Sequence, residues 1–235
     1  MNRRTIWSFF TLVVFFTFSF KAYSQNKPVA TNLPSPFFEK GAFNFLVIGD
    51  LGRNGEHNQK EVAEGLKKAA ELTDPKFIIS TGDNFYCCGV ASITDPQWKT
   101  SFEDVYTGSA LQIDWYPVLG NHDYQGNPQA EIDYSKVSRR WNMPGRYYTF
   151  LKKSEGKTIR FIFLDTNPFV KKYLEKSKEY ADVAKQDTTE QLRWLDSLLT
   201  RNEDIKIVVG HHPVYSSSKS HGNTPELIEK LEPRF

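Results

Sequence analysis

The stretch Gly82-Asp83-Asn84-Phe85-Tyr86 decides how the rest of the chain is interpreted. It follows the apolar run Lys76-Phe77-Ile78-Ile79-Ser80, which predicts a β-strand. A carboxylate and a phenol therefore lie three residues apart at a strand end. A carboxylate can bridge two metal ions that are roughly 3.5–4 Å apart, but Gly-Asp after a strand is also typical of an ordinary turn. This stretch alone leaves both interpretations open.

Three other apolar runs, residues 43–48, 115–119 and 205–209, end in the same way. They are followed by Gly49-Asp50, Gly120-Asn121 and Gly210-His211. Open α/β sheets bind ligands at the carboxyl ends of their strands, and glycine lets the backbone turn sharply there. Four such strand ends in one chain favour a shared metal site over four independent turns.

Helical segments alternate with these strands, so the sequence predicts an α/β fold. The predicted helices cover residues 54–72, a segment opened by Asp95-Pro96, and residues 130–140, 188–199 and 225–231. The first helix is expected to bury Val62, Leu66 and Ala69. Residues 146–151 and 158–164 predict an antiparallel hairpin. The charged segment 169–185 is expected to be a flexible surface insertion.

Together the strand-end motifs resemble those of the calcineurin-like metallophosphoesterases. They are GDLG (49–52), GDNFY (82–86), GNHD (120–123) and GHHP (210–213), and they occur in the family's order. Tyr86, three residues after Asp83, narrows the resemblance to small purple acid phosphatases of the tartrate-resistant type. The match runs from about Phe43 to the C-terminus. It implies an α/β fold of two mixed β-sheets packed face to face, with flanking helices.

The resemblance also implies a dinuclear metal site. Asp50 and Tyr86 would bind Fe(III). Asp83 would bridge it to a divalent ion (Fe, Zn or Mn), which Asn121 and His211 would also bind. The chemistry agrees, because a phenol with a pKa of ~10 ligates at acidic pH only where a strongly charged ion keeps it deprotonated. Such an ion also acidifies bound water, which would give a metal-bound hydroxide nucleophile below neutral pH.

The same resemblance implies two catalytic histidines. His122 and His221 match residues that contact the phosphate and help to protonate the leaving group. Asp123 is expected either to act on His122, by orienting its ring or raising its pKa, or to serve as a turn carboxylate, and the sequence leaves both roles open. His212 is expected to be structural and His57 to be a solvated residue at a helix start.

The implied activity is that of an acid phosphatase that hydrolyses phosphomonoesters. Its substrate would be a phosphorylated small molecule or a phosphoprotein, and it would act as a monomer. A phosphodiesterase or nucleotidase of the same superfamily is one alternative. A non-catalytic metal-binding fragment is another, because the family's Gly-His-x-His motif, which gives each metal one more histidine, is not found before Phe235. We therefore expect a C-terminally truncated copy with weakened metal binding and turnover.

Residues 1–24 predict a secretory signal peptide. Arg3 and Arg4 precede an apolar run, residues 6–20, and Ala22-Tyr23-Ser24 offers a cleavage site. A membrane anchor is the alternative, but the run is shorter than the ~20 residues that a spanning helix needs. We expect a secreted or periplasmic protein without stable membrane insertion after cleavage. A flexible leader (25–40) and an incomplete metallophosphoesterase domain (41–235) would follow.

Charge and cysteine content limit the partners and the redox chemistry. Residues 1–24 carry three basic side chains and no acid, so their removal changes the net charge from +2 to −1. This argues against a nucleic-acid partner held through phosphates. The two cysteines, Cys87 and Cys88, are adjacent. Their ~3.8 Å Cα separation is below the usual disulfide range, which favours free thiols over a strained vicinal disulfide.

Overall fold

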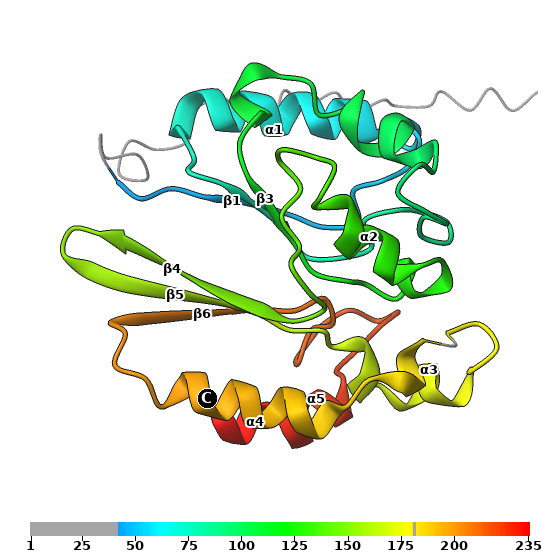
Figure 1. Cartoon of the computed structure of the whole chain (residues 1–235), viewed down its shortest axis with the longest axis vertical. Helices are drawn as coiled ribbons and strands as arrows, with labels where there is room; N and C mark the ends of the chain where they lie inside the picture. Colours follow the sequence, from blue (N-terminus) through cyan, green and yellow to red (C-terminus); the bar gives the residue numbers. More distant parts are fainter. Residues whose placement is uncertain (1–41, 181) are drawn as a thin grey trace, which may run out of the picture. The chain divides into compact units, whose positions relative to one another are not determined.

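The computed structural model of the protein describes residues 42–180 and 182–235. The predicted signal peptide (1–24) and leader (25–40) therefore lie outside the described residues. The described region contains two three-stranded β-sheets that face each other, with helices on their outer sides (Figure 1). The predicted α/β fold with two sheets and flanking helices is confirmed.

The first sheet carries three of the four predicted metal-binding strand ends. Its strands pair in parallel in the order β1-β2-β3, so their carboxyl ends lie at one edge. Their bounds are Leu46–Ile48 for β1, Ile78–Ser80 for β2 and Trp115–Pro117 for β3. Each is shorter than the apolar run that predicted it. Because Asp50, Asp83 and Asn121 each follow one of these strands, all three lie near the same edge of the sheet.

The second sheet is mixed and carries the fourth strand end. The predicted hairpin is confirmed, since β4 and β5 pair antiparallel, and β6 then pairs with β5 in parallel. The bounds are Tyr148–Ser154 for β4, Lys157–Phe163 for β5 and Ile205–Val209 for β6. Because β6 runs parallel to β5, its carboxyl end delivers His211 to the side of the sheet where β5 ends.

Five α-helices are described, of which α1 covers the outer face of the first sheet and α4 and α5 cover the outer face of the second (Figure 1). Their bounds are Gln59–Thr73 for α1, Pro128–Tyr134 for α2, Lys171–Glu175 for α3, Thr188–Leu199 for α4 and Pro225–Lys230 for α5, with one π-helical turn over Trp98–Glu103. Asp187 caps α4 by accepting hydrogen bonds from the backbone N–H groups of the first helical turn. Among the helices of residues 42–180 and 182–235, none is both long and apolar enough to cross a membrane.

The buried face of α1 differs from the predicted one. Ala63 and Ala70 are buried and Leu66 packs against the core, whereas Val62 is 51% exposed. The sequence predicted the correct helix with its apolar face displaced by about one residue. The small side chains of Ala63 and Ala70 let the helix lie close to the sheet, and a pattern search that favours large apolar residues overlooks them.

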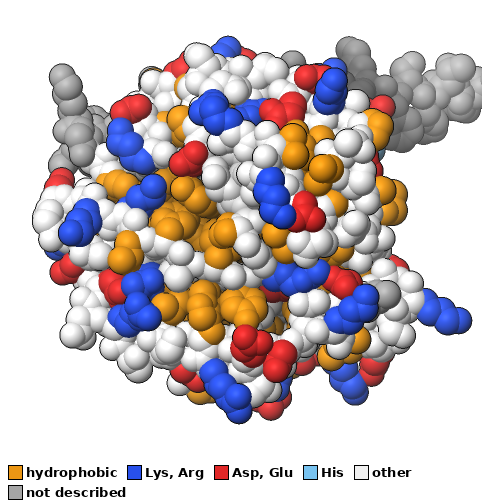
Figure 2. Space-filling view, viewed as in Figure 1, with side chains coloured by type: hydrophobic (Ala, Val, Ile, Leu, Met, Phe, Trp, Pro, Cys, Tyr) orange, Lys and Arg blue, Asp and Glu red, His pale blue; other side chains and the backbone are white. Residues whose placement is uncertain are grey.

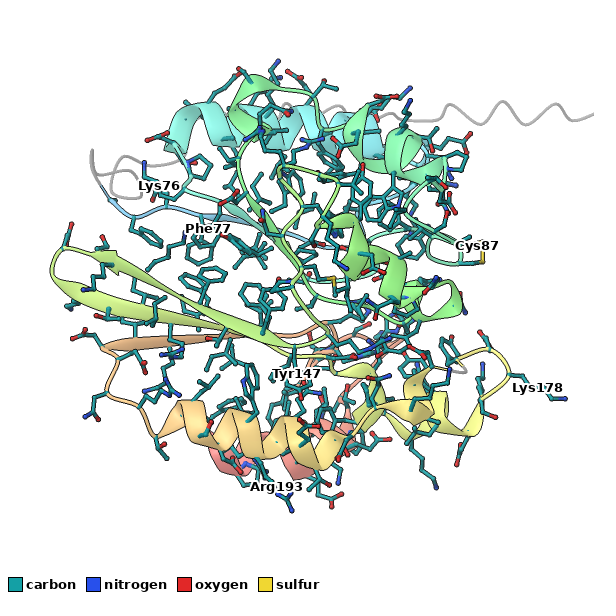
Figure 3. All side chains as sticks on the ribbon, viewed as in Figure 1. Lys76, Phe77, Cys87, Tyr147, Lys178 and Arg193 are labelled. Atoms are coloured by element: carbon teal, nitrogen blue, oxygen red, sulfur yellow. A yellow bond between two sulfur atoms is a disulfide. The ribbon has the colours of Figure 1, made fainter. Side chains whose placement is uncertain are left out.

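Aromatic side chains fill the space between the sheets. Phe77 is fully buried, and its ring lies 5.1 Å from that of Phe161 and 5.5 Å from that of Phe150. Figure 3 shows the Phe77 ring directed from the first sheet toward the second. In Figure 2, hydrophobic side chains are visible between the levels of the sheets, while acidic and basic side chains are spread over the rest of this face.

Replacing Phe77 by Ala is expected to destabilise the fold by about 3–5 kcal/mol, the usual cost of removing a large buried ring and leaving a cavity. Urea denaturation followed by circular dichroism would measure the loss. Leu72→Ala is a suitable control, because Leu72 is 62% exposed and its substitution should change the free energy of unfolding by less than about 0.5 kcal/mol. Equal midpoints for the two variants would contradict this view of the core.

The charged segment 169–185 is not the flexible insertion that the sequence suggested. Within its described residues, Tyr173, Tyr180 and Val183 are all buried and belong to the main core. The rings of Tyr173 and Tyr180 lie 4.8 Å apart. The lysines and glutamates of the segment are exposed, and because they dominate its composition they hide the buried aromatic residues among them. The segment is therefore a packed part of the domain.

The prediction of two free thiols is also wrong. Cys87 and Cys88 form a vicinal disulfide, visible beside the Cys87 label in Figure 3. The loop after Phe85 brings the two sulfur atoms together, which average Cα distances did not anticipate. The disulfide lies immediately after Tyr86 and so belongs to the segment that shapes the candidate site.

Candidate metal centre

Two glycines determine how closely the strand ends approach one another. Gly82 has φ +97°, and a Cβ atom there would lie only 2.8 Å from both the backbone nitrogen of Gly120 and Nδ1 of His211. A Cβ atom on Gly120 would lie 2.2 Å from Oδ1 of Asp83. No larger residue fits at either position without displacing the backbone. The glycines therefore allow Asp83 and His211 to meet at one point.

The two aspartates that follow the strands adopt an unusual backbone conformation. Asp50 has φ 54° and Asp83 has φ 50°, in the left-handed region that non-glycine residues seldom occupy. This geometry turns both side chains back toward the same edge of the first sheet. Such conformations cluster at functional sites, where the surrounding structure holds them in place.

Two carboxylates, those of Asp50 and Asp83, meet at the phenol of Tyr86. Its hydroxyl is 2.7 Å from Oδ2 of Asp83 and also makes a short contact with Oδ1 of Asp50. One hydroxyl has one proton and cannot donate to both carboxylates. Burial, followed by the hydrogen bonds to Asp50 and Asp83, raises the pKa of Tyr86 far above its ordinary value. A cation bound here would reverse this effect by stabilising the phenolate.

His211 faces the same carboxylate from the second sheet. Its Nδ1 lies 2.9 Å from the carbonyl oxygen of Thr81, so Nδ1 carries the proton and donates it. In a neutral ring, Nε2 then presents a lone pair toward Oδ1 of Asp83 at 3.5 Å. Two electron-rich atoms that face each other are the arrangement that a bound cation would stabilise. A histidine whose second nitrogen donates to a backbone carbonyl is typical of metal ligands.

The donor set fits metal ions, although it depends on two residue types outside the common ligands. Among residues 42–180 and 182–235, no three His, Cys, Asp or Glu side chains form a group that could hold one ion. Each predicted set contains only two side chains of these types. Asp50 and Asp83 need Tyr86 to complete the first set, and Asp83 and His211 need Asn121 to complete the second. Carboxylate and phenolate oxygens are hard donors, and Fe(III) is a hard ion.

One cavity of about 510 Å³ joins the predicted residues. It is lined by Asp50, Asp83, Tyr86, Asn121, His122, His211 and His221, together with residues that the sequence did not single out. The latter include Tyr173 and Lys172 from α3. The structure therefore brings the five predicted ligands and two of the three predicted catalytic residues to a single site.

His122 is held by the loop of the vicinal disulfide. Its Nδ1 is 2.5 Å from the carbonyl oxygen of Cys87, and its ring lies 4.4 Å from that of Tyr86. Its backbone N–H donates to Oδ1 of Asp83 at 2.8 Å. If Nδ1 donates to the carbonyl, Nε2 is left on the side of Asp83, 3.9 Å from Oδ2. The ring is thus oriented by Cys87.

Asp123, predicted either to act on His122 or to serve as a turn carboxylate, does not line the cavity. Its fully buried carboxylate accepts hydrogen bonds from the backbone N–H groups of Asn84, Phe85 and Gly120. Burial and the nearby charge of Asp83 raise the pKa of Asp123 to about 7, against the opposing effect of these N–H groups. Of the two roles that the sequence left open, the contacts support a structural one that ties the Asp83 loop to the Asn121 loop.

His212 and His57 differ in their surroundings. His57 is exposed, as expected. His212 lines the cavity, and burial, followed by the charges of His211 and Lys172, lowers the pKa of His212 to about 2. It is therefore a neutral hydrogen-bonding group.

Parallel strands whose ends gather carboxylate, phenol, amide and imidazole donors around one cavity are typical of metal-dependent phosphoesterases. The family model described as calcineurin-like phosphoesterase matches residues 43–235, and the chain belongs to this family.

Its relatives include purple acid phosphatases. The chain is 38% identical to purple acid phosphatase 7 of Arabidopsis thaliana over 82% of this chain and 60% of the relative. It is 35% identical to tartrate-resistant acid phosphatase type 5 of Homo sapiens over 82% of this chain and 62% of that protein. The predicted resemblance is confirmed. The chain spans about three fifths of the length of these curated relatives.

Solved structures show the same fold. GAP50, described as the anchor in the inner membrane complex of Plasmodium, is 29% identical with a TM-score of 0.68, over 83% of this chain and 62% of that chain. A dimetal phosphatase from Danio rerio has a TM-score of 0.56 at 14% identity, over 83% of this chain and 78% of that chain. The second likeness concerns the fold alone.

Proposed function

We propose that the protein is an acid phosphatase that hydrolyses phosphomonoesters at a dinuclear centre of Fe(III) and a divalent ion. The observation that carries this proposal is the position of Asp83. Its carboxylate meets Tyr86 on one side and His211 on the other, within one cavity. Asp50 and Tyr86 would complete the ferric set, and Asn121 and His211 the divalent set.

Bound ions would polarise the phosphoryl oxygens and supply an activated water. The side chains of this protein would contribute the remaining steps. His122 lines the cavity with its Nε2 atom 3.9 Å from Oδ2 of Asp83, and it would protonate the leaving oxygen. His221 also lines the cavity, from an exposed loop. Lys172 adds positive charge to the cavity lining and would favour a phosphate dianion.

Two alternatives are separable from this proposal. A phosphodiesterase or nucleotidase would bind its metal ions with the same residues at the strand ends but would act on a substrate with a different leaving group. A non-catalytic protein is suggested by GAP50, which shares the fold and is described as an anchor. The five predicted metal ligands line one cavity, and this arrangement favours a catalytic metal centre over a non-catalytic role. The signal-like residues 1–24 support secretion or a periplasmic location, and we further propose that the mature protein is a monomer.

Metal analysis and a substrate comparison test the proposal. We expect the protein to bind iron together with a divalent ion, and to hydrolyse p-nitrophenyl phosphate faster than bis(p-nitrophenyl) phosphate at acidic pH. A preference for the diester would favour the phosphodiesterase. A folded protein that binds neither ion and hydrolyses neither ester would overturn the assignment.

Replacing Tyr86 by Phe is expected to abolish visible absorption by the oxidised protein. The phenolate of Tyr86 would be the only donor in the predicted ferric set able to give ligand-to-metal charge transfer in the visible range. Tyr116→Phe is the matched control, because the Tyr116 hydroxyl contacts Asp114 outside the cavity. Persistence of the band in Tyr86→Phe would show that another residue binds the iron.

A further inference from the structure

The hydroxyl of Tyr173 enters the candidate metal centre from α3. Tyr173 is only 2% exposed, and its hydroxyl oxygen lies 2.9 Å from Oδ1 of Asn121 and 3.0 Å from Nε2 of His212. All three residues line the same cavity. The segment that the sequence suggested was a flexible insertion thus contacts a predicted ligand of the divalent ion.

The chemistry of the atoms fixes the direction of each hydrogen bond. Oδ1 of Asn121 can only accept, so the hydroxyl of Tyr173 must donate to it. Because that proton is used, Nε2 of His212 must donate to the Tyr173 oxygen. Nδ1 of His212 is then an acceptor, and its partner is Oγ1 of Thr166 at 2.8 Å.

Thr166 can supply the last proton. Its Oγ1 already accepts from the backbone N–H of His212 at 3.2 Å, which leaves its own hydroxyl hydrogen free for Nδ1. The result is an ordered chain in which each donor has one acceptor, from Thr166 through His212 and Tyr173 to Asn121. Thr166 is itself only 2% exposed, so the chain begins at a rigid, buried point beside the second sheet.

We propose that Tyr173 is a positioning residue that fixes the amide of Asn121 with its oxygen available to the divalent ion. A carbonyl oxygen has two lone pairs, so Oδ1 can accept from Tyr173 with one and bind an ion with the other. A rotated amide would present NH₂ to both groups and lose both interactions. This inference rests on the proposed function, because it takes Asn121 as a ligand of the divalent ion.

Tyr173→Phe tests the inference, with divalent-ion affinity as the readout. Titration of iron-loaded protein with Zn²⁺ in a calorimeter should show affinity reduced by roughly 10–100-fold, the usual cost of losing the hydrogen-bond partner of a metal ligand. The visible band, which reports the ferric set, should be unchanged. A general loss of structure would instead alter both the band and the Zn²⁺ affinity.

Tyr180→Phe is the matched control. Tyr180 belongs to the same buried segment and packs against Tyr173, but its hydroxyl accepts from Gln125 at 3.0 Å and does not line the cavity. Its Zn²⁺ affinity should equal that of the unchanged protein. His212→Gln, whose amide can still donate to Tyr173, should retain more affinity than His212→Leu.

The failure of this inference can be told from failure of the proposed function. If the unchanged protein binds no Zn²⁺ beside iron, the dinuclear assignment itself is wrong. If it binds Zn²⁺ and Tyr173→Phe binds it equally well, only the positioning role of Tyr173 falls. Equal Zn²⁺ affinities of His212→Gln and His212→Leu would show that the hydrogen bonds of His212 and Thr166 do not contribute to the positioning of Asn121.

Discussion

Replacing Asp83 by Asn is expected to remove both metal ions and to lower turnover by more than about 100-fold. Loss of a partner that merely supports a ligand already costs roughly 10–100-fold in affinity or activity, and Asp83 is the only residue assigned to both ions. An amide has the shape of the carboxylate but no charge, and its single carbonyl oxygen cannot bridge two ions while its nitrogen faces one of them.

The loss should not result from unfolding. In the metal-free protein, Asp83 is 4% exposed and meets Tyr86 and the nearby carboxylates of Asp50 and Asp123 without a lysine or arginine partner among the described residues. Removal of its charge relieves that repulsion. We therefore expect the free energy of unfolding of metal-free Asp83→Asn to be no lower than that of the unchanged protein.

Metal analysis after dialysis, together with phosphatase assays and urea denaturation, would check these results. Asp133→Asn is the control, because Asp133 forms a surface ion pair with Lys136 at 2.7 Å that contributes little to stability. It should retain both ions and full turnover. Two tightly bound ions in Asp83→Asn would mean that Asp83 does not bridge the centre.

Much of the site was predictable because its positions are set by backbone rules. The carboxyl ends of the strands of a parallel sheet lie at one edge. Glycines such as Gly82 and Gly120 mark where two backbone segments approach too closely to leave room for a side chain. These local signals were sufficient to predict that Asp50, Asp83 and Asn121 lie together at one edge of the first sheet. The same reasoning predicted the β4–β5 hairpin from its turn.

The features that the sequence did not predict depend on tertiary packing. Nothing local distinguishes Tyr173 from the lysines around it, and only the buried contact with Asn121 reveals its position. Asp123 is adjacent to His122 in sequence, yet its carboxylate turns inward to satisfy three backbone N–H groups. The Cys87–Cys88 bond likewise depends on the loop that holds both residues.

Replacing His122 by Ala is expected to lower kcat by roughly 10²–10⁴-fold, the usual contribution of a positioned general acid. Metal content should remain unchanged, because the contact of His122 with Asp83 that supports the site comes from its backbone N–H. Alanine preserves this contact and removes only the ring that lies beside Tyr86. Iron and divalent-ion analysis of the variant would establish that both sets are intact.

The size of the loss should depend on the leaving group, and this dependence separates proton donation from substrate binding. An alkoxide leaves poorly without a proton, whereas p-nitrophenolate leaves readily, so His122→Ala should impair hydrolysis of an alkyl phosphate far more than that of p-nitrophenyl phosphate. His57→Ala, which removes an exposed ring outside the cavity, should leave both rates unchanged. If the two substrates lose equal factors in kcat, His122 does not deliver the proton, and its ring contributes instead to binding the phosphate or to shaping the cavity beside Tyr86.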